Sequence, residues 1–150
     1  VSSKHFSKHT NDLIDKKTRD NMDFGLYIHE ILEYMDFKNP DYSFIKDNYS
    51  KERVKKFLNQ EVLKNIKEAK IYHEYEFVYD KDSIRYHGII DLMLEYDNHI
   101  DIVDYKLKNI EDFHYLDQLN GYREYISLVT SKEVDIYLYS ILDDKMKKIN

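Results

Sequence analysis

Apolar residues recur at intervals of three and four in two stretches of the chain, and this spacing is typical of an amphipathic α-helix. The first stretch predicts a helix that runs from Phe24 through Met35 and ends before Asn39-Pro40. The second predicts a helix over residues 51–69, with lysines on its polar face. The chain before residue 24 is polar and has few apolar anchors, so we expect residues 1–23 to form a loosely held lead-in.

Between residues 71 and 107 the pattern changes to short runs that are dense in Ile, Leu, Val and Tyr. These runs predict three successive strands, over residues 71–79, 84–96 and 100–107. Helical spacing returns over residues 113–129, and residues 134–142 predict a last strand. The order of the elements favours an α/β fold in which a mixed central sheet is flanked by helices.

The composition supports one folded domain over residues 1–150. Hydrophobic residues make up 42% and charged residues 35% of the chain, which excludes disordered and collagen-like classes. The absence of cysteine excludes disulfides, thiolate zinc sites and iron–sulfur clusters, and it favours a reducing, cytoplasmic setting. No run approaches the roughly 18 consecutive apolar residues of a membrane span, so we expect a soluble protein without a membrane partner. The first residue is Val1, which suggests a domain cut from a longer polypeptide.

The charge balance limits how the protein meets a nucleic acid. There are 23 basic and 29 acidic residues, which give a formal net charge of −6. A chain with this balance does not hold nucleic acid by bulk electrostatics alone. A substrate that carries phosphate therefore requires a local basic patch, a metal ion, or a partner that delivers it.

A predicted hairpin brings two carboxylates together. Asp97 and Asn98 suit a two-residue turn, and residues whose numbers add to 195 then face one another, which sets Asp91 opposite Asp104. Facing Cβ atoms lie about 4.5–5.5 Å apart, so two like charges there require compensation, for which a divalent cation is suited. Lys106 points to the same face. A surface pair of acids with a lysine salt bridge is the alternative, and a one-residue bulge would change the register.

Four further side chains are candidates for the same site. His29 lies beside the apolar stripe of the first helix and is either a third metal ligand or a half-buried polar residue. Gln118 and Tyr122 share one face of a later helix, where they contact a phosphate or a base, or belong to an ordinary helix surface. Glu74 is an outer acid of the site or, as we favour here, a solvated strand residue.

Five short motifs resemble, in order, those of RecB-type nucleases of the PD-(D/E)xK superfamily, and most of all the C-terminal nuclease domain of AddA-type helicase-nuclease subunits. The resemblance spans residues 2–142. Two departures from the family pattern are Glu76, where proline is usual, and the Leu107-Lys108-Asn109 segment. The motifs are Gly25-Leu26-Tyr27-Ile28-His29-Glu30-Ile31-Leu32, Glu74-Tyr75-Glu76-Phe77, Gly88-Ile89-Ile90-Asp91-Leu92, Asp104-Tyr105-Lys106 and Gln118-Leu119-Asn120-Gly121-Tyr122.

The resemblance implies a restriction-endonuclease-like core and a set of residue roles. His29, Asp91, Asp104 and the backbone carbonyl of Tyr105 would hold Mg²⁺ or Mn²⁺, and Lys106 would position or polarise the attacking water. Gln118 and Tyr122 would lie beside the DNA strand. Substitution of Asp91 or Asp104 by Ala is then expected to abolish cleavage and, because like-charge repulsion is relieved, to leave the fold intact or more stable.

The resemblance also implies a biological setting. The domain would be a Mg²⁺-dependent deoxyribonuclease, an exonuclease of double-strand-break repair and recombination that acts on single-stranded DNA. A helicase motor, in cis or in trans, would deliver the DNA, and a second helicase-nuclease subunit would be a partner. The alternative is a non-catalytic nuclease-like module that binds DNA or a partner protein.

Overall fold

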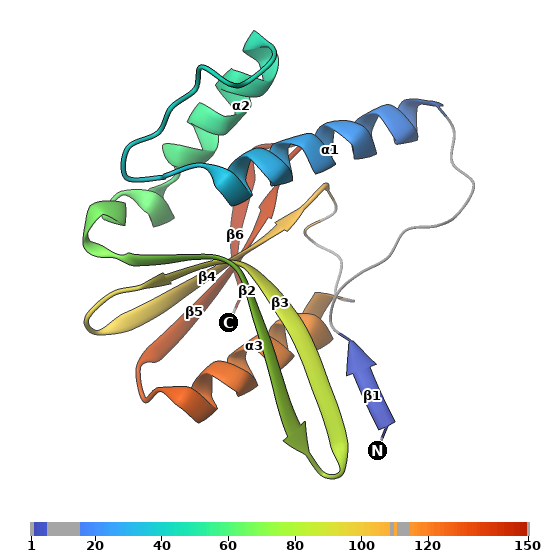
Figure 1. Cartoon of the computed structure of the whole chain (residues 1–150), viewed down its shortest axis with the longest axis vertical. Coiled ribbons are helices and arrows are strands. Elements are labelled where there is room, and N and C mark those ends of the chain that lie inside the picture. Colours follow the sequence, from blue (N-terminus) through green and yellow to red (C-terminus); the bar gives the residue numbers. More distant parts are fainter. Residues whose placement is uncertain (1, 6–15, 109, 111–114, 150) are drawn as a thin grey trace.

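The computed structural model describes residues 2–5, 16–108, 110 and 115–149 of the chain (Figure 1). One mixed sheet forms the centre, and helices lie on both of its faces. The α/β class and the mixed sheet flanked by helices are therefore confirmed, an arrangement consistent with a restriction-endonuclease-like core. The elements are β1 (Ser2–His5), α1 (Lys16–Tyr34), α2 (Asn48–Leu58), β2 (Lys70–Lys81), β3 (Ile84–Glu95), β4 (His99–Lys106), α3 (Leu116–Val129), β5 (Glu133–Ser140) and β6 (Lys145–Ile149), with two short 3₁₀ turns at Glu61–Leu63 and Ile66–Glu68.

The sheet has the strand order β1-β3-β4-β5-β6, and β2 pairs with the long strand β3. Strand β3 is antiparallel to β2 and β4, whereas β4 pairs with β5, and β1 with β3, in parallel. Strand β4 is buried along nearly its whole length. The polar side chains of β4 that are candidates for function consequently lie in the interior of the protein.

Two hydrophobic cores fix the helices to the sheet. On one face, α1 and α2 contribute Ile28, Leu32 and Phe57, which pack against residues of β3 and β4 such as Leu94 and Val103. On the other face, α3 packs against the opposite sides of the same strands, and Leu119, Ile126, Ile90, Ile102 and Ile136 are among its core residues. Consecutive residues of β3, such as Leu92, Met93 and Leu94, therefore point into opposite cores, as expected for a strand that is covered on both faces.

The hairpin register is confirmed. The β3–β4 pairs run from Leu92↔Val103 to Glu95↔Ile100, so the paired residue numbers add to 195, and the Tyr96 amide donates to the His99 carbonyl at 2.9 Å. The regular pairs end at Leu92 and Val103. Asp91 and Asp104 are the next residues outward, at the point where β3 leaves β4.

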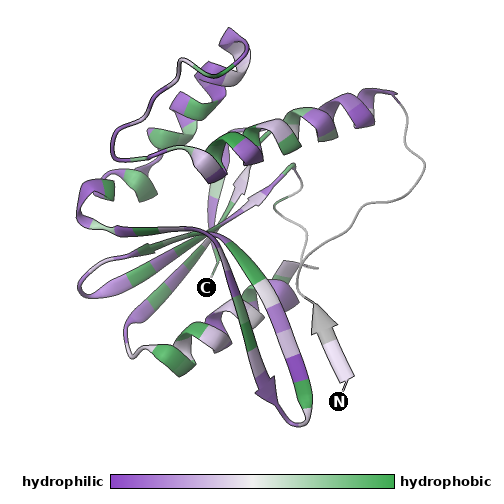
Figure 2. Cartoon of the chain, viewed as in Figure 1, coloured by the Kyte–Doolittle hydropathy of each residue, from purple (hydrophilic) through white to green (hydrophobic). Residues whose placement is uncertain are grey.

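The structure differs from the expected lead-in. Ser2–His5 forms β1 in parallel with β3, and α1 begins at Lys16 instead of Phe24. Both segments are polar, and Figure 2 shows that the first turns of α1 are hydrophilic, so apolar periodicity gives no signal there. Residues 6–15 of the lead-in lie outside the described residues.

The single helix predicted over residues 51–69 is wrong. Helix α2 begins after Asp47, whose carboxylate accepts the Ser50 amide at 2.8 Å, and it ends at Leu58. Asn59 terminates it, and the remaining apolar positions belong to the two 3₁₀ turns. Strand β6 was not predicted, because its sequence has no clear alternation and it is held by backbone pairing with β5. The predicted start of the third helix at residue 113 lies outside the described residues, and α3 is seen from Leu116.

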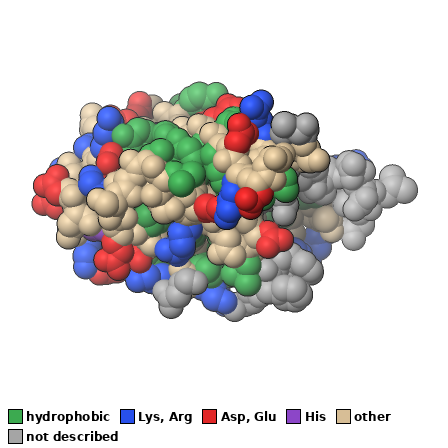
Figure 3. All heavy atoms as spheres, turned by 90° about the horizontal axis from the view of Figure 1, so that it is seen from below, with side chains coloured by type: hydrophobic (Ala, Val, Ile, Leu, Met, Phe, Trp, Pro, Cys, Tyr) green, Lys and Arg blue, Asp and Glu red, His purple; other side chains and the backbone are tan. Residues whose placement is uncertain are grey.

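Acidic and basic side chains are interspersed on the molecular face of Figure 3, with hydrophobic side chains between them. The described residues form no continuous basic surface on that face. Within the described part of the chain, no helix is long and apolar enough to cross a membrane.

Candidate metal centre

The candidate site forms where β3 separates from β4. Asp91 lies just beyond the last regular β3–β4 pair, and its Oδ2 accepts the Tyr105 backbone amide at 2.7 Å. This hydrogen bond satisfies a buried backbone donor of β4 with a carboxylate instead of a carbonyl. It also fixes the orientation of Asp91, whose second oxygen faces helix α1.

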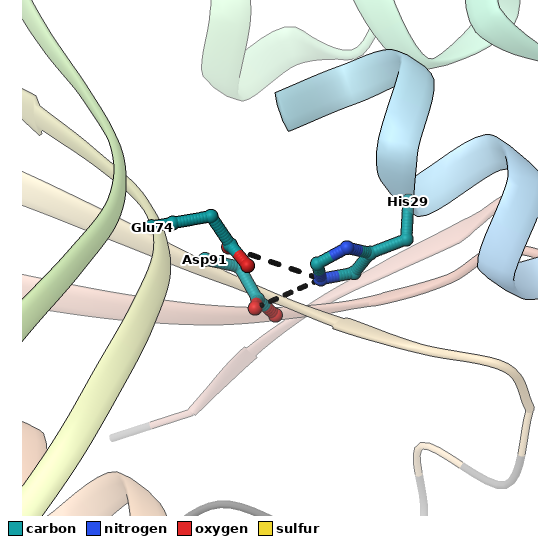
Figure 4. Close-up of side chains that lie close together, drawn as sticks. All are labelled: His29, Glu74 and Asp91. Atoms are coloured by element: carbon teal, nitrogen blue, oxygen red, sulfur yellow. Dashed lines mark hydrogen bonds and ion pairs between the residues drawn. The ribbon is translucent and has the colours of Figure 1, made fainter. Parts of the chain in front are cut away.

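Three potential metal ligands meet at this point, each from a different element (Figure 4). His29 of α1 places its Nε2 3.0 Å from Asp91 Oδ1 of β3 and 3.9 Å from Glu74 Oε2 of β2. The three ligand atoms lie within 4.8 Å of one another. Carboxylates are ligands that suit Mg²⁺ and Mn²⁺, and the imidazole adds a nitrogen ligand of the kind that transition-metal ions prefer. These residues therefore fit a divalent cation.

Glu74 takes a more central place than the sequence analysis gave it. It has a left-handed φ of 49° and interrupts the β2–β3 pairing between Tyr75↔Ile90 and His73↔Leu92. A signal for this placement is present in the sequence. Asp82 and Ser83 form a two-residue turn with positive φ, and the register that follows from it sets Glu74 opposite Asp91.

The electrostatics of Glu74 reflect crowding of negative charge. Burial and, to a lesser extent, the charge of the Asp91 carboxylate raise the pKa of Glu74 to about 7, although the nearby His29 acts in the opposite direction. A bound cation would attract both carboxylates and so offset the repulsion between Glu74 and Asp91. This is consistent with metal binding by these residues.

Asp104 and Lys106 form a buried ion pair beside this cluster. Lys106 Nζ lies 2.7 Å from Asp104 Oδ2, and the two side chains are 1% and 3% exposed. Lys106 also donates to Gln118 Oε1 at 2.6 Å and lies 4.2 Å from the centre of the Tyr115 ring. The ammonium group is thus held by a carboxylate, an amide and a π face.

Helix α3 adds a second contact to the same region. The Tyr122 hydroxyl donates to the Ile89 carbonyl at 2.8 Å and lies 3.5 Å from Asp104 Oδ1. Burial raises the pKa of Tyr122, so its hydroxyl stays protonated and remains a donor. This bond bridges the gap that opens between β3 and β4.

All the predicted site residues line one cavity of about 220 Å³. Asp104, expected as a ligand, is not a member of the three-residue cluster, and its Oδ2 faces Lys106. Tyr105 contributes its amide to Asp91, and the role expected for its carbonyl stays a prediction. The cavity is lined by His29, Glu74, Ile89, Asp91, Asp104, Tyr105, Lys106, Gln118 and Tyr122.

Comparisons with known proteins do not extend this description. No protein-family model matches the chain, and no curated protein matches its sequence. The resemblance to RecB-type nucleases therefore stays a prediction that rests on the motifs.

Proposed function

We propose that this domain is a metal-dependent deoxyribonuclease that hydrolyses phosphodiester bonds. One observation carries the proposal: a three-ligand cluster and a buried lysine open into the same cavity of about 220 Å³. Phosphodiester hydrolysis requires neutralised charge on the phosphate and a water activated near neutral pH. A divalent cation, when bound, supplies both.

The residues divide this work between them. His29, Glu74 and Asp91 are the groups that would hold the cation, and Asp104 borders them from β4. Lys106 offers N–H donors to a phosphate oxygen or to the attacking water. Gln118 fixes the Lys106 side chain through the 2.6 Å bond, so that it acts as a positioning residue.

The resemblance to RecB-type nucleases implies a substrate and partners, and the charge of the chain is compatible with delivery of the DNA by a partner. With a net charge of −6, the domain is poorly suited to capture DNA by itself. The mixed charges in Figure 3 agree with this on the face shown. Following the resemblance to AddA-type helicase-nuclease subunits, we propose that single-stranded DNA is delivered by a helicase motor, in cis or in trans, together with a second helicase-nuclease subunit, during double-strand-break repair. Weak activity is expected of the isolated domain.

The test is cleavage of end-labelled single-stranded DNA by the purified protein in Mg²⁺, Mn²⁺ or EDTA. Asp91→Asn is the main variant, because asparagine keeps an acceptor for the Tyr105 amide while it removes the ligand charge. Asp97→Asn is the matched control, since it removes the same charge from an exposed turn of the same hairpin. Calorimetry with Mn²⁺ reports binding independently of cleavage.

We expect metal-dependent cleavage that is lost in EDTA and in Asp91→Asn and is kept in Asp97→Asn. Cleavage at the wild-type rate by Asp91→Asn would remove the site assignment. Binding of Mn²⁺ without cleavage would indicate that the helicase partner is required. Absence of both binding and cleavage by the wild type would favour the non-catalytic module.

A further inference from the structure

A second cavity, of about 280 Å³, adjoins the candidate metal centre, and His29 and Tyr105 line both cavities. It lies between α1 and the ends of β4 and β5. Of the described residues that line it, none is acidic and none is a lysine or an arginine. The hydrolysis proposed above makes no use of this cavity, which leaves it for a part of the substrate that is neither charged nor cleaved.

The wall of the cavity is mainly apolar. Met22 and Leu26 lie one turn apart on α1 and therefore share a face of the helix, and Leu107, directly after β4, completes the wall. Leu26 is 67% exposed. Apolar surface that stays in water inside a concave site gains free energy when an apolar group covers it. The lining therefore favours a neutral, mainly apolar ligand group.

The cavity depends on a close approach of α1 to Leu107. A Cβ on the buried Gly25 would stand 2.5 Å from Leu107 Cδ1, so glycine permits this approach. The Leu107 backbone is held in place, since its carbonyl accepts the Leu142 amide at 3.0 Å. The wall is consequently formed before a ligand arrives. Leu107 also belongs to the segment that departs from the RecB-type pattern, which makes this wall a feature of the present chain.

His29 connects the two cavities. Its Nε2 points to Asp91 Oδ1 at 3.0 Å (Figure 4), and its ring packs edge to face against Tyr105, with the ring centroids 5.4 Å apart. These two rings separate the metal ligands from the apolar wall, so a phosphate at the metal centre lies close to that wall. In a single strand, the sugar next to each phosphate carries a base, and unpaired bases bury their faces against aromatic and apolar side chains.

We propose that this cavity binds the base of a nucleotide next to the phosphodiester that is cleaved. The proposal rests on the proposed function, because a phosphate at the metal centre is what brings the base to the cavity. Among the described lining residues, only His29 and Tyr105 have polar side-chain atoms. The base is therefore held by apolar contact, and the cavity accepts different bases without reading their edges.

The test compares thymidine 5′-monophosphate with 2-deoxyribose 5-phosphate, which has the same phosphate and sugar but no base. Neither compound contains a phosphodiester bond, so binding is measured in Mg²⁺ without cleavage. The methyl resonance of Met22 in ¹³C-methyl-methionine-labelled protein reports occupancy of the cavity, and Met22→Leu assigns it. We expect a Met22 shift with the nucleotide and binding about fivefold tighter, or more, than that of the sugar phosphate.

Leu26→Ser is the test variant, and Leu128→Ser is the matched control. The two leucines are 67% and 65% exposed on helices, and Leu128 does not line the cavity. Because both side chains are exposed, neither substitution removes a core contact. We expect Leu26→Ser to lower the preference for the nucleotide by about threefold and Leu128→Ser to leave it unchanged.

Equal binding of the two compounds, no Met22 shift, or equal effects of the two serine variants would overturn the proposal. Cleavage of single-stranded DNA by the same preparation separates this result from the proposed function. Cleavage without a preference for the nucleotide would leave the nuclease standing and remove the base site. A preference for the nucleotide with a Met22 shift, but without cleavage, would keep the base site and favour the non-catalytic module.

Discussion

Removal of one charge from the Asp104–Lys106 pair is expected to destabilise the protein strongly. Loss of one partner from a buried ion pair typically costs about 3–5 kcal/mol, because the remaining charge stays buried without compensation. Both side chains are at least 97% buried, so water does not replace the lost partner. In Asp104→Ala, Gln118 still accepts one hydrogen bond from Lys106. We therefore expect a loss of unfolding free energy near the lower end of this range, at about 3 kcal/mol.

This prediction revises the expectation that Asp104→Ala leaves the fold intact or more stable. That expectation treated Asp104 as one of two repelling acids. In the structure its Oδ2 lies 2.7 Å from the Lys106 ammonium, and attraction at this distance outweighs repulsion from Asp91.

Urea unfolding in EDTA, followed by circular dichroism, measures the effect. With an m-value of about 1–3 kcal/mol per molar urea, a loss of about 3 kcal/mol moves the midpoint by roughly 1–3 M. Lys106→Met should have a similar effect, and the double variant should lose less than the two single variants together, with a coupling of at least about 2 kcal/mol.

The exposed Lys64–Glu61 pair is the control, with an expected coupling below about 0.5 kcal/mol. Additive effects at Asp104 and Lys106, or an Asp104→Ala variant as stable as the wild type, would refute the reasoning.

Three further predictions use the same unfolding assay without metal. The pKa of Glu74, about 7 in the folded state, lies above the value of 4.5 expected when unfolded, so stability should fall as pH rises from 4.5 towards 7. Glu74→Gln should therefore remove this dependence and stabilise the protein by roughly 1–2 kcal/mol at about pH 8, and an unchanged pH profile would contradict this. Tyr122→Phe should cost about 1–2 kcal/mol, since the Ile89 carbonyl loses its 2.8 Å donor; no loss would show that the bond contributes little. Asp47→Ala should cost about 1 kcal/mol through loss of the α2 cap, and an unchanged midpoint would argue against that cap.

Much of the sheet could be predicted, because a two-residue turn determines which residues of the two flanking strands face one another. The Asp97-Asn98 turn fixes which residues of β3 and β4 face one another, and the observed pairs agree. Apolar periodicity located the buried part of α1, because a helix face that packs against the core needs apolar residues at intervals of three and four. Strands β1 and β6 could not be predicted in this way, because their sequences are polar and backbone pairing holds them in the sheet.

The site was only partly predictable. Asp91 and Asp104 were identified because carboxylates embedded in apolar strands are rare and require compensation. The form of that compensation was not predictable from β3 and β4 alone. Glu74 enters the cluster through the register of the β2–β3 hairpin, and the Asp104 carboxylate is neutralised by Lys106, two residues away on the same strand.

Strand β4 carries two buried aspartates whose opposite surroundings give a final prediction. Asp104 has an ammonium group at 2.7 Å, whereas Asp101 has a histidine at 3.5 Å and the negative charge of Asp135 beside it. Because the pKa of Asp101 is raised by burial, its ionisation opposes folding as pH increases. Asp101→Asn is therefore expected to raise the free energy of unfolding at about pH 8, and Asp104→Ala to lower it. A loss of stability in Asp101→Asn, measured by urea unfolding, would mean that the carboxylate already has a compensating partner within the chain.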